Sequence, residues 1–247
     1  MTLETGLTLS ARATARHTFK CERRSGILQT SVVNGFKGMA QVRRKPSQER
    51  SKEKVELILS AAKALIGSRG NDAVSMREIA KHCGIAPSSI YQYFPDKNAL
   101  LAAIMDEYYA QFRGIIESSF SAVSDLESIC EGIDKGVDQF YKLFIDEPLL
   151  ATIWSSVQAN TVLRNMDIAD SKQNAERLTD LMHKLYPSIP RHEIYDSNFL
   201  FNHMIESTSR LALSVGNKEG KRLIKSLKTV FIQHTKQMVT QARPSPK

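Results

Sequence analysis

A glycine and a proline three residues apart constrain this chain more than any other feature of its sequence. Gly84 can end a helix, because glycine adopts the left-handed C-terminal conformation without steric cost. Pro87 can open the next helix, since its fixed φ and missing N–H suit a first turn. Before Gly84, apolar residues recur with the spacing of one helical face: Met76, Ile79, Ala80 and Cys83. Two short helices around a tight turn are therefore expected.

A start signal precedes the first of these helices. Ser75 and Glu78 fit the S-x-x-E capping box, in which each residue satisfies a backbone N–H of the other. Residues 75–94 are accordingly predicted to form a helix-turn-helix, whose second helix enters the DNA major groove in proteins of this kind.

Helical spacing also dominates the rest of the chain. Aromatic residues make up only 7% of the sequence, and no long alternating β-branched stretch occurs. An all-α fold is therefore predicted. The further helices are expected at residues 51–69, 97–119, 128–145, 148–157, 167–185, 193–215 and 218–241.

Positive charge is concentrated at the start of the chain. Residues 1–97 carry 17 Lys and Arg against 8 Asp and Glu, a net charge of +9, and residues 98–247 carry a net charge of −1. Neutralising phosphates supplies most non-specific DNA affinity, so this charge favours a nucleic-acid partner. A solvated basic tail is the alternative, because most of the excess lies before residue 50.

Residues 1–50 differ in composition from the remainder of the chain. They are rich in Arg, Lys, Ser and Thr and lack helical or strand spacing, which predicts a disordered basic arm. An organellar transit peptide has a similar composition. A third interpretation places the natural start at Met39, which leaves a short basic arm that either contacts DNA or only aids solubility. Residues 242–247 are expected to be a disordered tail.

Residues 52–112 resemble the DNA-binding domain of the TetR family of bacterial transcriptional regulators. The matching positions are Ser75, Ile79, Ala80, Gly84, Ile85, Tyr91, Phe94, Lys97 and Leu100. The resemblance implies a three-helix helix-turn-helix domain followed by an α-helical regulatory and dimerisation domain, here residues 113–241. Two positions depart from the family pattern: Ala86 replaces the usual Ser or Thr before the recognition helix, and Tyr93 stands where His is frequent.

The motif assigns DNA contacts to nine residues. Those expected to face bases are Pro87, Ser88, Ser89 and Gln92. Those expected to face phosphates are Tyr91, Tyr93 and Lys97, with Ser75 and Arg77 at the start of the preceding helix. Ser75 could act only as a helix cap, and Tyr91 could be partly core.

The resemblance also implies a homodimer, formed by the last two helices, that reads a palindromic operator in double-stranded DNA. It implies a small-molecule effector pocket among the preceding helices. Its candidate residues are Phe120, Phe140, Phe144, Trp154, Met166, Phe201 and His203, although any one such residue is more often ordinary core.

Other functional classes find no support in the sequence. The sequence has no nucleotide-binding, serine-hydrolase or zinc-protease motif, so we expect no enzyme, catalytic residue or cofactor. The three cysteines lack metal-ligand spacing and suit a reducing cytoplasm, and no apolar run is long enough for a membrane span. The predicted function is a homodimeric repressor released by a small molecule. A DNA-bound architectural or partner-recruiting protein without an effector is the alternative.

Overall fold

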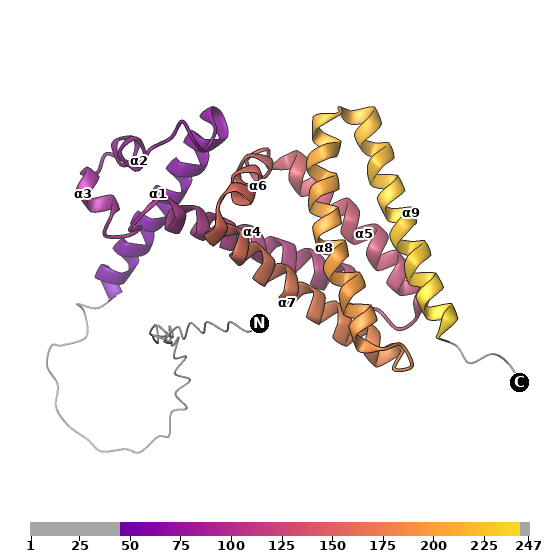
Figure 1. Cartoon of the computed structure of the whole chain (residues 1–247). Coiled ribbons are helices and arrows are strands. Elements are labelled where there is room, and N and C mark those ends of the chain that lie inside the picture. The colour runs from indigo at the N-terminus through magenta and orange to yellow at the C-terminus, as the bar shows by residue number, and fades with distance from the viewer. Residues whose placement is uncertain (1–44, 243–247) are drawn as a thin grey trace, which may run out of the picture. The chain divides into compact units, whose positions relative to one another are not determined.

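The structure is a computed structural model, and it describes residues 45–242. This part of the chain contains nine α-helices and no strand, which confirms the all-α prediction (Figure 1). The helices are α1 (Lys45–Arg69), α2 (Met76–His82), α3 (Pro87–Ile90), α4 (Lys97–Phe120), α5 (Leu126–Asp146), α6 (Leu149–Ala159), α7 (Thr161–Leu185), α8 (Arg191–Ser214) and α9 (Asn217–Gln241).

One apolar core joins the helix-turn-helix to the helices behind it. Ile58 of α1, Ile79 of α2 and Ile90 of α3 are fully buried against the start of α4. The same core continues to Leu150 and Trp154 of α6, and α1 packs on both α4 and α6. The DNA-binding helices are therefore coupled by direct packing to the regulatory helices.

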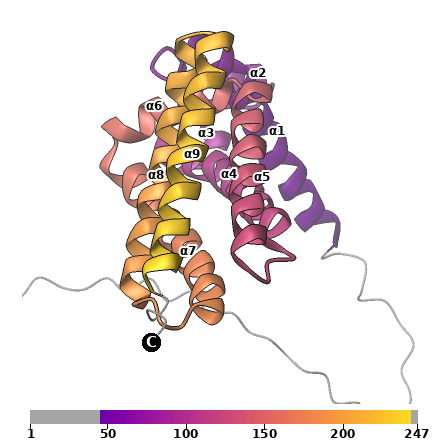
Figure 2. The same cartoon turned by 90° about the vertical axis from the view of Figure 1, so that its right-hand side faces the viewer.

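A second core lies between α5, α7, α8 and α9. Figures 1 and 2 both show α8 and α9 side by side as an antiparallel pair. Gly216 connects them with a φ of +88°, a conformation that favours glycine. At Gly220 the two helices approach so closely that a Cβ atom would lie 2.3 Å from the carbonyl oxygen of Ala212. This contact requires glycine.

Two helix starts differ from the prediction by six residues each. α1 begins at Lys45 rather than near residue 51, because Pro46 is tolerated in a first turn and good helix formers come after it. α7 begins at Thr161, six residues early, since Asn160 caps it by accepting from two backbone N–H groups. α4 runs without a break through the domain boundary expected at residue 112.

The predicted start at Met39 and most of the predicted basic arm fall on residues 1–44, which lie outside the described residues. The last part of that arm, residues 45–50, is described and is helical rather than disordered. Residues 243–247 of the predicted tail also lie outside, and Ala242 directly follows α9. Between residues 45 and 242 no helix is long and apolar enough to cross a membrane.

Candidate DNA-binding surface and effector cavity

The start of α2 is fixed by reciprocal hydrogen bonds. Ser75 is the N-cap, and its Oγ accepts a hydrogen bond from the backbone N–H of Glu78 at 3.3 Å. The Glu78 carboxylate accepts in return from the N–H and the hydroxyl of Ser75, each at 2.8 Å. These two donors lower the pKa of Glu78, because they favour its charged form. The predicted capping box is confirmed, and the Ser75 hydroxyl is engaged within the protein.

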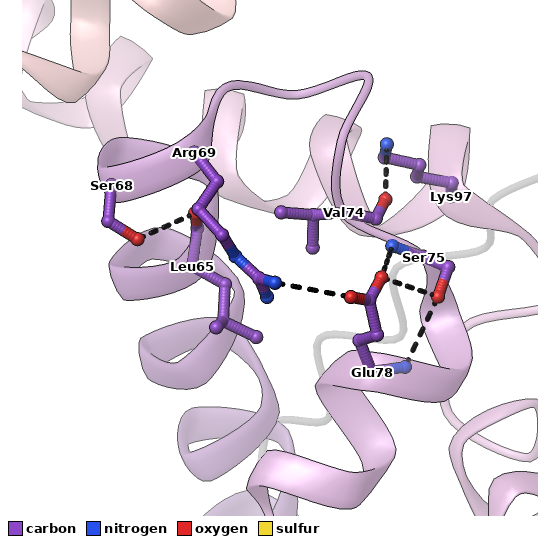
Figure 3. A network of polar contacts seen from close by, with 7 residues as sticks. All are labelled: Leu65, Ser68, Arg69, Val74, Ser75, Glu78 and Lys97. Carbon is purple, nitrogen blue, oxygen red and sulfur yellow. Dashed lines mark hydrogen bonds and ion pairs between the residues drawn. The ribbon is translucent and has the colours of Figure 1, made fainter.

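Two basic side chains from neighbouring helices hold the same corner (Figure 3). Arg69 at the end of α1 lies 3.2 Å from Oε1 of Glu78. Lys97 at the start of α4 donates from Nζ to the carbonyl of Val74 at 2.7 Å, and also to the carbonyl of Asn71. Desolvation lowers the pKa of Lys97. Its ammonium therefore fastens the loop between α1 and α2, a role that the sequence did not indicate.

The turn between α2 and α3 forms as its sequence signals predict. Gly84 has a φ of +65°, and Ile85 donates its N–H to the carbonyl of Ala80 at 3.0 Å, which closes the end of α2. Ala86 precedes α3 without any side-chain cap, and Pro87 occupies the first turn. α3 has only four residues, so Tyr91, Gln92 and Tyr93 lie in the turn after it.

Most of the predicted DNA-contacting side chains are accessible. The exposed ones are Ser75, Arg77, Pro87, Ser88, Tyr91 and Gln92. The half-buried ones are Ser89, Tyr93 and Lys97, and Tyr93 packs against the core of the helix-turn-helix. The short α3 thus presents polar side chains on one side, while Ile90 and Phe94 are buried on the other.

A separate cavity of about 60 Å³ lies among α4, α5, α6, α7 and α8. Five of the seven predicted pocket residues line it: Phe120, Phe140, Trp154, Phe201 and His203. The two others do not. Phe144 is fully buried and stacks on Phe140, with ring centroids 5.2 Å apart, and Met166 packs against the first core. Tyr109 and Phe112 complete the aromatic wall.

The polar side of the cavity was not predicted from the sequence. Asp167, Asp170 and Asn174 of α7 line it, and they are buried. Their i, i+3 and i+7 spacing places all three on one face of the helix. This polar stripe in a helix with an apolar face was the signal that could have revealed them.

Asp167 is held by neutral donors from two other helices. Its Oδ1 accepts from the indole Nε1–H of Trp154 at 3.1 Å and from the hydroxyl of Tyr109 at 3.4 Å. Burial raises the pKa of Asp167, and these hydrogen bonds oppose that shift. Asp167 therefore connects α7 with both α6 and α4.

The other two carboxyl groups of the cavity face guanidinium groups. Asp170 Oδ1 accepts from Arg113 at 2.9 Å, and Asp170 Oδ2 accepts from the amide of Asn174 at 2.8 Å. Glu206 of α8 lies 2.5 Å from Nε of Arg210, although these two atoms are not aligned as a hydrogen bond. Desolvation nevertheless raises the pKa of Glu206 to about 7.

Comparison with known proteins gives these two sites a family context. The family model "Bacterial regulatory proteins, tetR family" matches residues 58–104, which include the helix-turn-helix. A second model, "Tetracyclin repressor-like, C-terminal domain", matches residues 127–239, which include α5 to α8 of the cavity wall but not α4. The chain belongs to the TetR family. The resemblance found in the DNA-binding part is thus confirmed and extends over the regulatory part.

Individual relatives match shorter stretches. The uncharacterized HTH-type transcriptional regulator YuxN of Bacillus subtilis (strain 168) is 43% identical over 58 residues, 24% of this chain and 20% of that protein. The HTH-type transcriptional regulator UidR of Escherichia coli (strain K12) is 28% identical over 131 residues, 51% of this chain and 65% of that protein. The chain therefore spans less than two thirds of the length of these two relatives.

Solved structures share the fold over most of the chain. The fatty acid degradation regulator FadR from Bacillus halodurans superimposes with a TM-score of 0.57 at 18% identity, covering 72% of this chain and 94% of that one. A TetR transcription regulator from Haloarcula marismortui ATCC 43049 gives 0.57 at 13% identity, covering 77% and 98%. At this identity the likeness supports the fold alone.

Proposed function

We propose that this TetR-family protein is a DNA-binding transcriptional repressor, a homodimer released from a palindromic operator by a small molecule. The observation that carries the proposal is the exposed polar side of α3, which is anchored by the buried Ile90 and follows an α2 whose start is fixed by Ser75, Glu78 and Lys97. A rigid, exposed helix with a buried opposite face suits insertion into a major groove. We place this activity in the cytoplasm.

The DNA contacts divide into two groups. Gln92 can pair bidentately with adenine, and Ser88 can accept or donate at a base edge. Arg77 and Tyr91 are exposed beside them and suit phosphate, which fixes register without reading sequence. Lys97 is placed differently from our sequence-based expectation, and we assign it to positioning the loop before α2.

Selection from a random duplex library tests this function directly. We expect full-length protein to enrich a two-fold symmetric site, and Gln92→Ala to lose about 1–2 kcal/mol of discrimination at one base pair per half-site. Arg77→Ala is the matched control, because it should weaken all sequences alike. No enriched site would contradict a sequence-specific repressor, and many dispersed sites in genome-wide occupancy would favour an architectural protein.

An exposed apolar face supports the proposed homodimer. Leu200 and Leu211 share one side of α8, and Val215 follows the end of this helix; they are 58%, 51% and 38% exposed. Val230 of the adjacent α9 is 53% exposed. Contiguous exposed apolar side chains on a helix pair mark an association surface, and a two-fold dimer would cover the same face on both protomers.

Leu211→Asp is expected to weaken dimerisation by roughly tenfold, because a carboxylate would lose water where leucine gains from burial. Sedimentation equilibrium over a range of protein concentrations measures the change. Val162→Asp replaces a side chain that is 59% exposed on α7 and should leave association unchanged. Equal effects of the two variants would argue against α8 as the interface.

Effector control is supported by the connections of the cavity. Asp167 on its wall contacts Tyr109 of α4 and Trp154 of α6. Both of these helices pack on α1 of the DNA-binding part. A ligand that pulls on Asp167 would thus shift the two helices that support α1, and it would act by changing the population of the DNA-binding conformation.

A further inference from the structure

The cavity combines aromatic walls with a surplus of negative charge. Three carboxyl groups line it, from Asp167, Asp170 and Glu206. The latter two face Arg113 and Arg210, whereas Asp167 has only neutral donors. Among the lining residues only His203 could add a positive charge. The charges of His203 and Arg210 act on Asp167 and oppose the rise of its pKa, but its carboxyl group forms no ion pair with a described residue.

An unused acceptor belongs to a residue that lines the same cavity. Asn174 is 4% exposed and lines the cavity. Its amide nitrogen donates to Asp170, but its Oδ1 has no hydrogen-bond partner among residues 45–242. A buried acceptor without a donor destabilises the folded protein, because it has lost its hydrogen bonds to water. A ligand that brings N–H groups would remove this cost.

The aromatic rings strengthen the preference for a positive ligand. Trp154 meets Tyr109 and Phe112 edge to face, with ring centroids 5.8 Å and 5.5 Å apart. The electron-rich faces of such rings attract cations, and they repel anions as the carboxylates do. The carboxyl groups of the described residues form no cluster suited to a metal ion, so an organic cation fits this lining better.

We infer that the cavity binds a small organic ammonium ion, with its charge against Asp167, an N–H group toward Oδ1 of Asn174 and its alkyl part among the aromatic rings. This inference rests on the proposed effector function and names the chemical class of the effector. A cavity of about 150 Å³ accommodates the six carbon atoms of benzene, so about 60 Å³ limits the enclosed part of the ligand to roughly two or three non-hydrogen atoms.

Size-matched probes test this inference on the full-length protein. Trp154 is the only tryptophan of the chain and lies on the cavity wall, so its fluorescence reports binding directly. n-Propylammonium is protonated at pH 8 and is compared with 1-propanol and propionate at constant ionic strength. We expect saturable binding of the ammonium ion, with a dissociation constant on the order of millimolar, and at least roughly tenfold weaker binding of both other probes.

Two variants locate the site. Asp167→Asn should weaken propylammonium binding by roughly tenfold or more, since it removes the unpaired carboxylate. Glu206→Gln, which changes a separate helix, should weaken it as well and serves if Asp167→Asn fails to fold by circular dichroism. Glu131→Gln on the exposed face of α5 is the control and should bind like the unchanged protein.

The outcomes separate the ligand class from the proposed function. Binding of 1-propanol or propionate as tightly as the ammonium ion, or no binding of any probe, would overturn the cationic site. Gel-shift titration with the selected operator is then run with and without propylammonium. Cation binding that leaves DNA affinity unchanged would support the site and contradict effector control.

Discussion

Lys97→Met is expected to weaken binding to every DNA sequence by roughly tenfold without changing the salt dependence of binding. The substitution keeps the aliphatic stem but removes the ammonium that bonds to the carbonyls of Asn71 and Val74. Hydrogen bonds to a charged group are worth about 1.5–3 kcal/mol each, less where water competes, so we expect a total loss of about 3 kcal/mol in unfolding free energy. The capping-box corner would loosen, and α2 would present α3 less well.

The salt slope separates this positioning role from a phosphate contact. Removing one cation that neutralises a phosphate lowers the slope of log affinity against log salt by about 1. Arg77→Met removes an exposed cation of α2 and should lower the slope, whereas Lys97→Met should keep it and lower the midpoint of urea unfolding. If Lys97→Met lowered the slope and left stability unchanged, the ammonium would be a phosphate ligand, as the sequence alone suggests.

The helix-turn-helix shows which features local sequence signals can predict and which depend on the packing of distant helices. Gly84, Pro87 and the Ser75–Glu78 pair act within a few residues, and the structure places each of them as predicted. Lys97 bonds to carbonyl groups more than 20 residues away. Such a contact depends on how α1, α2 and α4 pack, and no spacing along the chain encodes it.

The cavity likewise combines features that the sequence predicts with features that depend on packing. Large aromatic side chains were predicted to line it because their size makes them prominent in any apolar pocket, and Trp154, Phe140 and Phe201 do so. Phe144 has the same chemistry but lies in the core beside the cavity. Burial alone therefore could not separate wall from core. The helical spacing of the carboxyl groups of α7 is visible in the sequence, but their burial depends on packing against α4 and α6.

Burial of these acids also affects stability. Asp167 ties α6 to α4 through neutral donors, and Asp170 ties α7 to α4 through Arg113. Replacing such groups by apolar residues would often stabilise a protein, because desolvating a charge is expensive. Their presence in the wall of a cavity is a cost to folding that a cationic ligand would offset, which couples ligand binding to the stability of this wall.

Glu206→Gln is expected to remove most of a pH dependence of stability worth about 3 kcal/mol. Burial raises the pKa of Glu206 from 4.5 to about 7 in the folded protein, and each pKa unit corresponds to about 1.4 kcal/mol. Below pH 4.5 the carboxyl is protonated in both states and costs nothing. Between pH 4.5 and about 7 the unfolded chain releases this proton while the folded protein keeps it, so the unfolding free energy falls as the pH rises, and above about pH 7 the loss is complete.

Urea unfolding at pH 5 and pH 8, at one protomer concentration, measures this difference. Arg210, Asp167 and His203 lie near Glu206 and remain in the variant. Because burial also raises the pKa values of Asp167 and Asp170, the variant should keep a smaller pH dependence of stability of the same sign. Loss of the Arg210 ion pair shifts both measurements, so the difference between the two pH values is the decisive quantity. Glu131→Gln should retain the full dependence. Equal pH dependence in Glu206→Gln and the unchanged protein would mean that the Arg210 guanidinium already compensates the buried charge.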